Sequence, residues 1–504
     1  MNDQIFMLYT EIKAKKNGLL VALLKRAAFF AKKGYLVHIC TLSYDPHIHL
    51  VYKSLFDDGF LDAQYKNNIK FINLYTILQK REFCLDSFSI AQNALSLVRD
   101  GSINEAGNIK VYKDKKVSKY YIRDKKGFLS YINIFNDGKM NQRVKYNEQE
   151  EISSIQILDE NKYVTSEFIY DVNGRIVANK IFFDKKLSHI HYFDENGILL
   201  ETFKNEVDFL FHILLAYYND NCIFIIDRAI VFSEYLLKNK KENHKIVGVI
   251  HAAHYNNPND KNSKPNGHYR YYIENLEKLD KLIFLTNQQK NDFVEKYGDY
   301  QNTQVIPHFF DSKENKNLLR EDYHCICVAR FDQVKRLPLL VKMFKKIVLN
   351  LPLAKLSLYG FGADEANIRN TIQECSLEDH VFIKGFTSDV STVFQQADLM
   401  LFSGSSEGFC MAILEALSNG CPVASFDINY GPSDMIINNV NGLLIKNNNE
   451  KEYIQQVSAL LSNRKHLQEL QNNARKSVEK FESENIFKLW DELLLELSLC
   501  KREI

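Results

Sequence analysis

Apolar positions in the first seventy-five residues follow two alternating patterns. Ile5 to Tyr9 and Leu36 to Leu42 are short apolar runs typical of buried strands, and Leu19 to Lys33 has the spacing of an amphipathic helix. A strand–helix–strand order of this kind predicts a parallel sheet. The pattern returns with a helix at Glu206 to Tyr218. The strands expected after it are Cys222 to Asp227, Val247 to His251 and Lys281 to Leu285.

A different pattern occupies residues 108 to 204, where aromatic and β-branched residues alternate with polar ones. A faint repeat of about 23 residues, long enough for one hairpin, recurs at Ile122-Arg123-Asp124, Lys145-Tyr146-Asn147, Ile169-Tyr170-Asp171 and Tyr192-Phe193-Asp194. Asn173-Gly174 and Asn196-Gly197 predict turns because both residue types tolerate positive φ. We expect an antiparallel β insertion in the first α/β domain, with a structural role or a role in assembly or acceptor recognition.

A second set of strands and helices follows residue 305 and predicts another doubly wound parallel sheet. Its expected strands are Cys325 to Ala329, Lys355 to Tyr359, Val381 to Lys384, Leu399 to Phe402 and Pro422 to Phe426. A final amphipathic helix, Glu482 to Leu499, is expected to return to the first domain. The predicted organisation is a discontinuous first domain over 1–75 and 206–305, a β-rich insertion over 76–205, a second α/β domain over 306–480, and the returning helix over 481–504.

Composition narrows the function classes. The chain has 504 residues, and its 64 basic and 63 acidic side chains give a formal net charge of +1, so no global field favours nucleic acid. We expect no membrane span, since no apolar run approaches about 20 residues. We also expect no signal peptide and therefore a cytoplasmic location, with at most peripheral membrane contact. The nine cysteines form no CxxC pair, so neither zinc nor disulfides are expected.

The strongest chemical signal is the run Ser406 to Ala416, which contains two glutamates eight residues apart. Glu407 follows an expected strand, and the carboxyl ends of parallel strands are where doubly wound folds bind ligands. Gly408 to Met411 are expected to open the next helix and to offer free N–H donors to a sugar or phosphate. Glu407 can accept hydrogen bonds from hydroxyls, and Glu415 can take a ribose diol. The alternative is a carboxylate that complements the helix dipole and a second one facing solvent.

A basic pair follows another strand. Arg330 and Lys335 are five residues apart in a strand-to-helix loop, where they can converge on a diphosphate and neutralise the charge that develops as a sugar leaves. A solvated basic loop is the alternative.

Two histidines, His251 and His254, lie at the end of a strand of the first domain. A neutral imidazole there could bind a sugar hydroxyl or approach the acceptor. We do not expect a metal, because no acidic or cysteine ligand lies nearby in sequence. A structural histidine is the alternative, and the sequence leaves open which of the two faces a ligand.

Glycine-containing turns follow three expected strands. These turns are Asn17-Gly18, Tyr359-Gly360-Phe361-Gly362 and Lys384-Gly385-Phe386. In the first, N–H groups at a helix N-terminus can face an anion, with a plain turn as the alternative. In the second, the glycines permit tight turning or close approach of a ligand, and the third could place an aromatic beside a planar base.

Together these motifs resemble glycosyltransferase family 4. The resemblance rests on the EGF-x5-E pattern from Glu407 to Glu415, the pair Arg330 and Lys335, the turn at Tyr359 to Gly362, and His251. A narrower resemblance covers nearly the whole chain, including the β insertion. It is to the bacterial wall-teichoic-acid α-glycosyltransferases and to the O-GlcNAc transferases of serine-rich or serine-aspartate repeat adhesins, with the teichoic-acid type favoured.

The resemblance implies a GT-B fold, in which two Rossmann-like domains face a cleft. It implies that a UDP-sugar binds mainly to the second domain and is transferred with retention of configuration, without a metal or other cofactor, to a polymeric or protein acceptor on the side of the first domain. It also implies a homo-oligomer or a partner subunit bound through the insertion. No carboxylate is clearly placed as a nucleophile, which favours front-face substitution.

The resemblance also assigns roles to residues. Arg330 and Lys335 would hold the diphosphate, Glu407 the sugar hydroxyls and Glu415 the ribose. His251 would lie near the sugar. The expected donor-binding residues are Gly18, Tyr359, Gly360, Lys384, Gly385, Phe386, Gly408, Phe409, Cys410, Met411 and Glu415. The chain departs from the pattern at Asn17, where many relatives have a glycine, and at Cys410, where many have a small or polar residue.

Other functions share this pattern. A phosphorylase or a nucleotide-sugar epimerase would use the same diphosphate site, and a non-catalytic partner subunit would share the fold but need not keep the charged residues. The sequence does not separate glucose from N-acetylglucosamine donors. Lysines of the insertion could face a polyphosphate acceptor or simply solvent: Lys113, Lys115, Lys116 and Lys119.

Overall fold

The structure, a computed structural model, describes residues 4–12, 18–81, 101–103, 107–124, 127–218, 221–258, 260, 262–311 and 318–498. Contacts divide the chain into two compact units: Met1–Ile246 with Leu499–Ile504, and Val247–Ser498. We call them unit 1 and unit 2 and describe each by itself. The division falls inside strand β15 (His244–Val249). Asn17 lies outside the described residues.

Unit 1 contains a parallel sheet in which the neighbouring strands run β14-β1-β2-β3. Its apolar strands are buried because helices cover them, and α1 shows why: its buried residues Leu20, Leu23, Ala27 and Phe30 recur at helical spacing. The strands are β1 (Gln4–Tyr9), β2 (Leu36–Thr41), β3 (Ile69–Asn73) and β14 (Cys222–Ile226). The helices are α1 (Gly18–Lys32), α2 (Ile48–Asp57), α3 (Leu74–Leu78), α4 (Glu206–Tyr217) and α5 (Ala229–Lys238).

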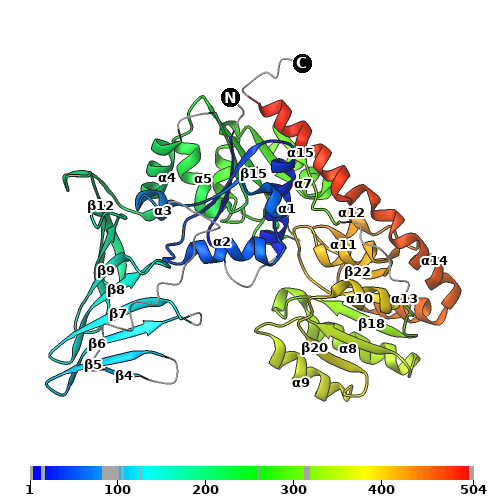
Figure 1. Cartoon of the computed structure of the whole chain (residues 1–504). Helices are drawn as coiled ribbons and strands as arrows, with labels where there is room; N and C mark the ends of the chain where they lie inside the picture. Colours follow the sequence, from blue (N-terminus) through cyan, green and yellow to red (C-terminus); the bar gives the residue numbers. More distant parts are fainter. Residues whose placement is uncertain are drawn as a thin grey trace. The chain divides into compact units, whose positions relative to one another are not determined.

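The predicted antiparallel insertion is present in unit 1 as a ten-stranded sheet whose strands follow one another in sequence order (Figure 1). Its strands are β4 (Gly101–Ile103), β5 (Ile109–Lys113), β6 (Lys116–Arg123), β7 (Leu129–Asn136), β8 (Lys139–Tyr146), β9 (Ile152–Leu158), β10 (Val164–Tyr170), β11 (Ile176–Phe183), β12 (Lys186–Phe193) and β13 (Leu199–Phe203). The alternation of polar and apolar residues therefore predicted this part of the fold correctly.

The 23-residue repeat of the insertion is a repeated turn. Asp171 and Asp194 each accept hydrogen bonds from the backbone N–H groups two and four residues later, and Asn147 does the same. Gly174 and Gly197 close these turns at φ of 74° and 78°. The turns predicted at Asn173-Gly174 and Asn196-Gly197 are therefore present, and in both it is the glycine that has positive φ. The aspartate side chain that begins each turn sets its geometry.

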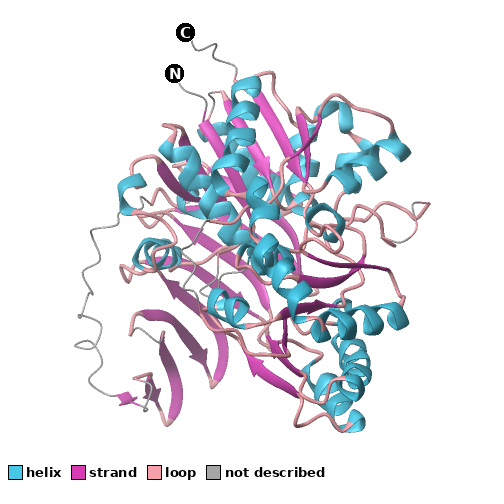
Figure 2. Ribbon diagram, turned by 90° about the vertical axis from the view of Figure 1, so that its right-hand side faces the viewer, coloured by secondary structure: helices cyan, strands magenta, loops and turns pink. Residues whose placement is uncertain are grey.

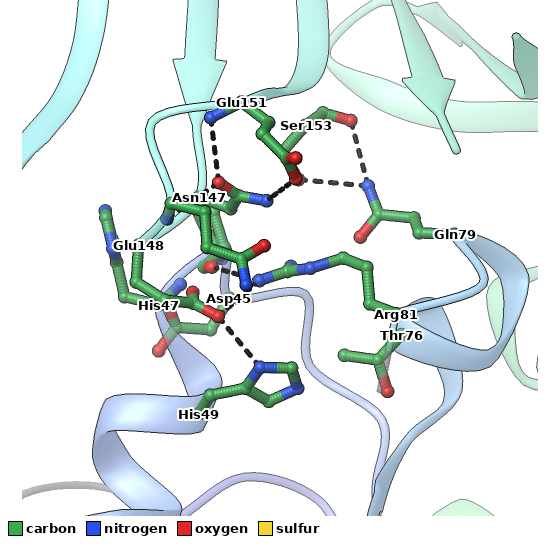
Figure 3. A network of polar contacts seen from close by, with 12 residues as sticks. Asp45, His47, His49, Thr76, Gln79, Arg81, Asn147, Glu148, Glu151 and Ser153 are labelled. Carbon is green, nitrogen blue, oxygen red and sulfur yellow. Dashed lines mark hydrogen bonds and ion pairs between the residues drawn. The ribbon is translucent and has the colours of Figure 1, made fainter. Parts of the chain in front are cut away.

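A buried polar network joins the insertion to the parallel part of unit 1 (Figure 3). The Oε1 atom of Glu148, in the turn after β8, lies 2.8 Å from Nδ1 of His49 and 2.6 Å from Nη2 of Arg81. All three side chains are at most 5% exposed. Beside them, Gln79 donates from Nε2 to the hydroxyl of Ser153 at 2.9 Å. The insertion is thus fastened to α2 and to the segment after α3 by charged groups that are shielded from water.

Unit 2 contains a parallel arrangement in which β15 pairs with β16 (Lys281–Phe284) and β16 with β17 (Thr303–Val305). It also contains a six-stranded parallel sheet with the order β20-β19-β18-β21-β22-β23. The six strands are β18 (His324–Val328), β19 (Lys355–Tyr359), β20 (Val381–Gly385), β21 (Leu399–Phe402), β22 (Val423–Asp427) and β23 (Gly442–Lys446). Five strands were expected. The sixth was missed because it is a five-residue edge strand that starts with a glycine.

Helices flank the parallel strands of both units (Figure 2). Those of unit 2 are α6 (Arg270–Glu274), α7 (Asn287–Tyr297), α8 (Leu337–Asn350), α9 (Glu365–Cys375), α10 (Val390–Gln396), α11 (Met411–Ser418), α12 (Pro432–Met435), α13 (Glu450–Ser462), α14 (Arg464–Ala474) and α15 (Ser483–Leu497). Glu496 of α15 pairs with Lys281 of β16 at 2.8 Å. No helix in the described part of the chain is long and apolar enough to cross a membrane. The predicted domain boundaries stay predictions.

Candidate functional site

The predicted site residues of unit 2 follow the carboxyl ends of parallel strands, where open α/β sheets bind ligands. Arg330 lies two residues after β18, Gly360 directly after β19, Phe386 directly after β20 and Glu407 five residues after β21. Because these strands are neighbours in one parallel sheet, the loops after them lie along one edge. Gly18 is the exception among the predicted residues: it is exposed at the start of α1 in unit 1, and nothing lies within 4 Å of a Cβ built on it.

Lys335 and Glu407 form an ion pair between Nζ and Oε1. The two side chains are only 15% and 16% exposed, so water screens the pair poorly. Burial alone would lower the pKa of Lys335, but attraction to Glu407 outweighs it and holds that pKa above its usual value. Asp332 fixes the segment by accepting a hydrogen bond from the backbone N–H of Lys335. The structure therefore brings a charged lysine and a carboxylate together from loops 72 residues apart.

Arg330 has different surroundings from Lys335. Its side chain is 80% exposed and its Nη2 lies 2.9 Å from Oδ2 of Asp332. The predicted convergence of the two cations is thus not formed in this structure, because Lys335 is held by Glu407 while Arg330 is held at the surface by its own neighbour.

Gly360 and Gly362 are required by contacts within the protein. A Cβ on Gly360 would overlap the carbonyl oxygen of Ala329, and one on Gly362 would overlap that of Phe331. Hydrogen bonds join the same segments, with Ala329 donating from N to Tyr359 and Phe331 from N to Phe361. These glycines let the loop after β19 lie directly against the loop that contains Arg330.

Two aromatic rings are exposed beside these glycines. Phe361 is 44% and Phe386 is 68% exposed, and their ring centroids are 6.1 Å apart at an angle of 69°. Gly360 donates from N to the carbonyl of Gly385 at 2.8 Å, and this bond joins the loop after β19 to the end of β20. Tyr359 is half-buried and Lys384 is exposed. Exposed rings at a loop edge offer the kind of surface on which a planar base stacks.

The segment around Glu407 is held on both sides by backbone. Glu407 donates from N to the carbonyl of Asn429 at 3.1 Å and accepts from the N–H of Tyr430 at 2.8 Å. On its other side, a Cβ on Gly408 would overlap the carbonyl oxygen of His251. The loop with Glu407 is therefore wedged between the segment after β22 and the turn after β15.

The residues that follow Gly408 are mostly interior. Phe409 and Cys410 are 2% and 5% exposed, and α11 begins only at Met411, so the helix starts three residues later than expected. Burial raises the pKa of the Cys410 thiol well above its usual value, which leaves it protonated and unreactive. Glu415 is half-buried on α11.

The two histidines after β15 have different roles. His254 is fully buried, lies 5.9 Å from the parallel ring of Tyr430, and has its pKa lowered to about 3 by burial and by Lys296. It is therefore a neutral residue of the interior. His251 is partly exposed and lies past the end of β15, which stops at Val249.

Two residues around His251 were missed by sequence reasoning. The imidazole of His308 stacks on that of His251 at 5.4 Å and 18°, and meets the edge of Phe409 at 5.5 Å. The phenol oxygen of Tyr269 accepts hydrogen bonds from the N–H groups of His251 at 3.0 Å and Ala252 at 2.9 Å. No motif marks either residue, because each meets its partner across a long stretch of chain.

Metal-binding groups are not assembled in the part of the chain that the structure describes. No set of three or more histidine, cysteine or acidic side chains there could hold a metal ion. The seven described cysteines are free and buried: Cys40, Cys222, Cys325, Cys327, Cys375, Cys410 and Cys421. Cys84 and Cys500 lie outside the described residues.

Comparison with protein families and curated sequences identifies relatives. Residues 309–477 match the family described as glycosyl transferases group 1. The poly(ribitol-phosphate) alpha-N-acetylglucosaminyltransferase of Staphylococcus aureus is 25% identical over 502 residues, which cover 97% of this chain and 98% of that protein. The poly(glycerol-phosphate) alpha-glucosyltransferase of Bacillus subtilis is 28% identical over 378 residues, 72% of this chain but only 55% of that protein. The chain thus spans about half the length of the Bacillus relative.

Solved structures agree on the fold. A crystal structure of TarM has a TM-score of 0.82 at 23% identity and covers 97% of this chain and 98% of its own. The pneumococcal O-GlcNAc transferase GtfA in complex with UDP and GlcNAc has a TM-score of 0.79 at 20% identity and covers 98% and 99%. These matches confirm the predicted GT-B fold and the resemblance read from the motifs. The chain carries a glycosyltransferase group 1 domain in a GT-B fold and is related to teichoic acid α-glycosyltransferases and to the GtfA O-GlcNAc transferases.

Proposed function

We propose that this protein is a retaining, UDP-sugar-dependent glycosyltransferase that moves N-acetylglucosamine or glucose to a hydroxyl of a bacterial surface polymer of the wall-teichoic-acid type. The observation that supports this most is the Lys335–Glu407 pair at the carboxyl edge of the parallel sheet, wedged against the turn that contains His251. A nucleotide-sugar needs a cation for its phosphates and an acceptor for its hydroxyls, and we assign these roles to Lys335 and Glu407.

The ion pair suggests how the donor would enter. A diphosphate would compete with Glu407 for the ammonium of Lys335, and the released carboxylate could then accept hydrogen bonds from sugar hydroxyls. Arg330, exposed beside Asp332, could turn towards the same diphosphate. Both cations would then stabilise the charge that grows on the leaving diphosphate, without a metal ion.

The polymer acceptor is favoured over a protein acceptor by the length of the match. The Staphylococcus poly(ribitol-phosphate) enzyme aligns over 97% of this chain, whereas the Streptococcus pneumoniae GtfA subunit, a UDP-N-acetylglucosamine–peptide N-acetylglucosaminyltransferase, aligns over 61%. Transfer to serine residues, or to sugar on a serine-rich glycoprotein, is the second candidate. A non-catalytic partner subunit is the third. The charged pair Lys335 and Glu407 argues against it, because such a subunit need not keep these residues.

The test measures transfer from UDP-N-acetylglucosamine and UDP-glucose to poly(ribitol phosphate), poly(glycerol phosphate) and a serine-rich peptide. We expect transfer to a poly(alditol phosphate) with an α-linked product by NMR, and a loss of about 100-fold or more in Glu407→Gln. The matched control is Glu365→Gln, which removes the carboxylate of an exposed pair with Arg369 on α9 and should keep full activity. Transfer to the peptide alone would favour the second candidate, and no transfer by the wild type would favour the third.

A further inference from the structure

The turn after β15 is held by the side chain of one tyrosine. Ile250 makes the last sheet-like bond of this segment, donating from N to the carbonyl of Ile283 at 2.9 Å. The next two N–H groups, of His251 and Ala252, point to the phenol oxygen of Tyr269 at 3.0 and 2.9 Å. A phenol oxygen has two lone pairs and can accept both bonds. Tyr269 is only 6% exposed, so water does not readily replace it.

The tyrosine itself is well anchored. It lies directly before α6, and the next ring on that helix side, Tyr272, is fully buried with its centroid 6.4 Å away. A Cβ on Gly248 would lie 2.9 Å from the ring of Tyr272, so a glycine is needed for this segment to lie so close to β15. The phenol oxygen is therefore presented to the turn from a position set by packing.

The opposite side of the turn contacts the loop of Glu407. Because a Cβ on Gly408 would overlap the carbonyl oxygen of His251, the two backbones touch with no intervening side chain. The imidazole of His251 is aligned by His308, which in turn meets Phe409 of the same loop. A displacement of the turn would therefore change the distance between His251 and Glu407.

We propose that Tyr269 is a positioning residue for sugar transfer, which sets His251 against the Glu407 loop by accepting the two backbone hydrogen bonds at the end of β15. This inference rests on the proposed function, since it assumes that His251 and Glu407 act on the same substrate. Tyr269 acts on the reaction only through the turn it holds.

The first test is Tyr269→Phe, which removes one oxygen and keeps the ring. We expect kcat to fall about 10- to 100-fold, because small misplacements of site groups are costly. The KM for the donor and the Kd for UDP should change less than about threefold, since the diphosphate cations are untouched. The matched control is Tyr453→Phe, which removes a buried phenol that donates to the carbonyl of Ala424 at 2.9 Å and should keep wild-type kcat. Wild-type kcat in Tyr269→Phe, or an unfolded Tyr269→Phe beside a folded control, would overturn the proposal.

A double-mutant cycle separates positioning from a general loss of rigidity. If Tyr269 acts through His251, adding Tyr269→Phe to His251→Ala should lower kcat by less than about twofold. The full single-variant loss in the His251→Ala background would contradict the proposal.

A third readout does not depend on activity. Amide hydrogen exchange at 251–252 should become at least about tenfold faster in Tyr269→Phe, because both protons lose their acceptor. Unchanged exchange in Tyr269→Phe would overturn the proposal, whether or not the wild type transfers sugar. If exchange becomes faster but the wild type transfers no sugar, the result counts against the proposed function alone.

Discussion

At the scale of single residues, the site depends on backbones that touch where glycines permit it. Gly408 lies against His251, and Gly431 lies against the carbonyl of Phe409 with a φ of 116°. In both cases the nearest atom is a backbone carbonyl, which cannot rotate away as a side chain could. The loops of the site therefore have little freedom to adjust to an added methyl group.

Gly408→Ala tests this directly. Its Cβ would overlap the carbonyl of His251, so the Glu407 loop must shift, and we expect transfer to fall about 100-fold. Steady-state kinetics of the variant measures the loss of transfer, and thermal unfolding measures any loss of stability. Gly267→Ala is the matched control, because it adds the same methyl group where nothing lies within 4 Å and should change neither. Normal turnover in Gly408→Ala would show that the two loops are not tightly coupled.

Sequence reasoning predicted which residues lie at the strand ends but not how they pair. Glu407 and Lys335 were recognisable because each follows a buried strand in a characteristic local motif. Their ion pair was not, since it depends on the path of two loops. Tyr269 and His308 carried no signal, because their contacts with the turn after β15 join groups far apart in sequence and leave no periodic pattern.

At the scale of elements, the parallel strands and the three helices that were predicted with bounds lie within a few residues of their expected positions. The failures have a common cause. The missed strands β3, β17 and β23 are at most five residues long and lie at sheet edges, so each offers only a short pattern. The end of β15 was placed two residues late because Ile250 continues the apolar run, while the backbone leaves the sheet and His251 donates to Tyr269.

The charged network of Figure 3 predicts how the insertion is held. Burial alone would raise the pKa of Glu148, but the hydrogen bond from His49 and the charge of Arg81 outweigh it and leave that pKa below its usual value. A depressed pKa in the folded state means that the unfolded state takes up a proton first as pH falls. The stability that Glu148 contributes is therefore present above about pH 4.5 and is lost as pH falls through its folded-state pKa.

Glu148→Gln should lower the free energy of unfolding by about 3 kcal/mol at pH 7, since it leaves Arg81 buried without its carboxylate. The difference from wild type should shrink below about pH 4.5, because the carboxyl of the unfolded state is then protonated and folding must release that proton. Denaturant unfolding of both proteins between pH 3 and 7 measures this. Glu160→Gln is the control: its carboxylate is 84% exposed beside Lys139 and should have no measurable effect. An equal effect of Glu148→Gln at pH 3 and at pH 7 would mean that the charge of Glu148 does not stabilise the contact between the insertion and the rest of unit 1.

At the scale of the whole molecule, the sequence predicted two α/β parts and an antiparallel insertion between segments of the first. The sequence did not predict how contacts group the chain into units. Residues 247–305 associate with the C-terminal half of the chain, in part through α7, whose Gln288 donates to the side chain of Asn429 at 2.8 Å. Such a grouping depends on which helices and loops contact one another, and the local sequence pattern does not predict these contacts.

The ten-stranded insertion ends in an edge strand, β13, which begins with apolar, exposed residues. Ile198, Leu199 and Leu200 are 62%, 49% and 56% exposed, and in the described sheet β13 pairs only with β12. A cavity of about 430 Å³ beside it is lined in part by Leu200 and Tyr217. An edge of this kind is a template for pairing with another chain, and Glu201 is the one charged residue of β13.

We therefore expect the protein to associate through β13. Light scattering should give a wild-type mass that is a multiple of 58.7 kDa, and Leu199→Lys should shift it to 58.7 kDa, because a lysine on the edge opposes strand pairing. Ile230→Lys places the same charge on an exposed residue of α5 in the same unit and should leave the oligomer intact. A monomeric wild type would contradict self-association through β13, and an oligomeric Leu199→Lys would place the interface elsewhere on the molecule.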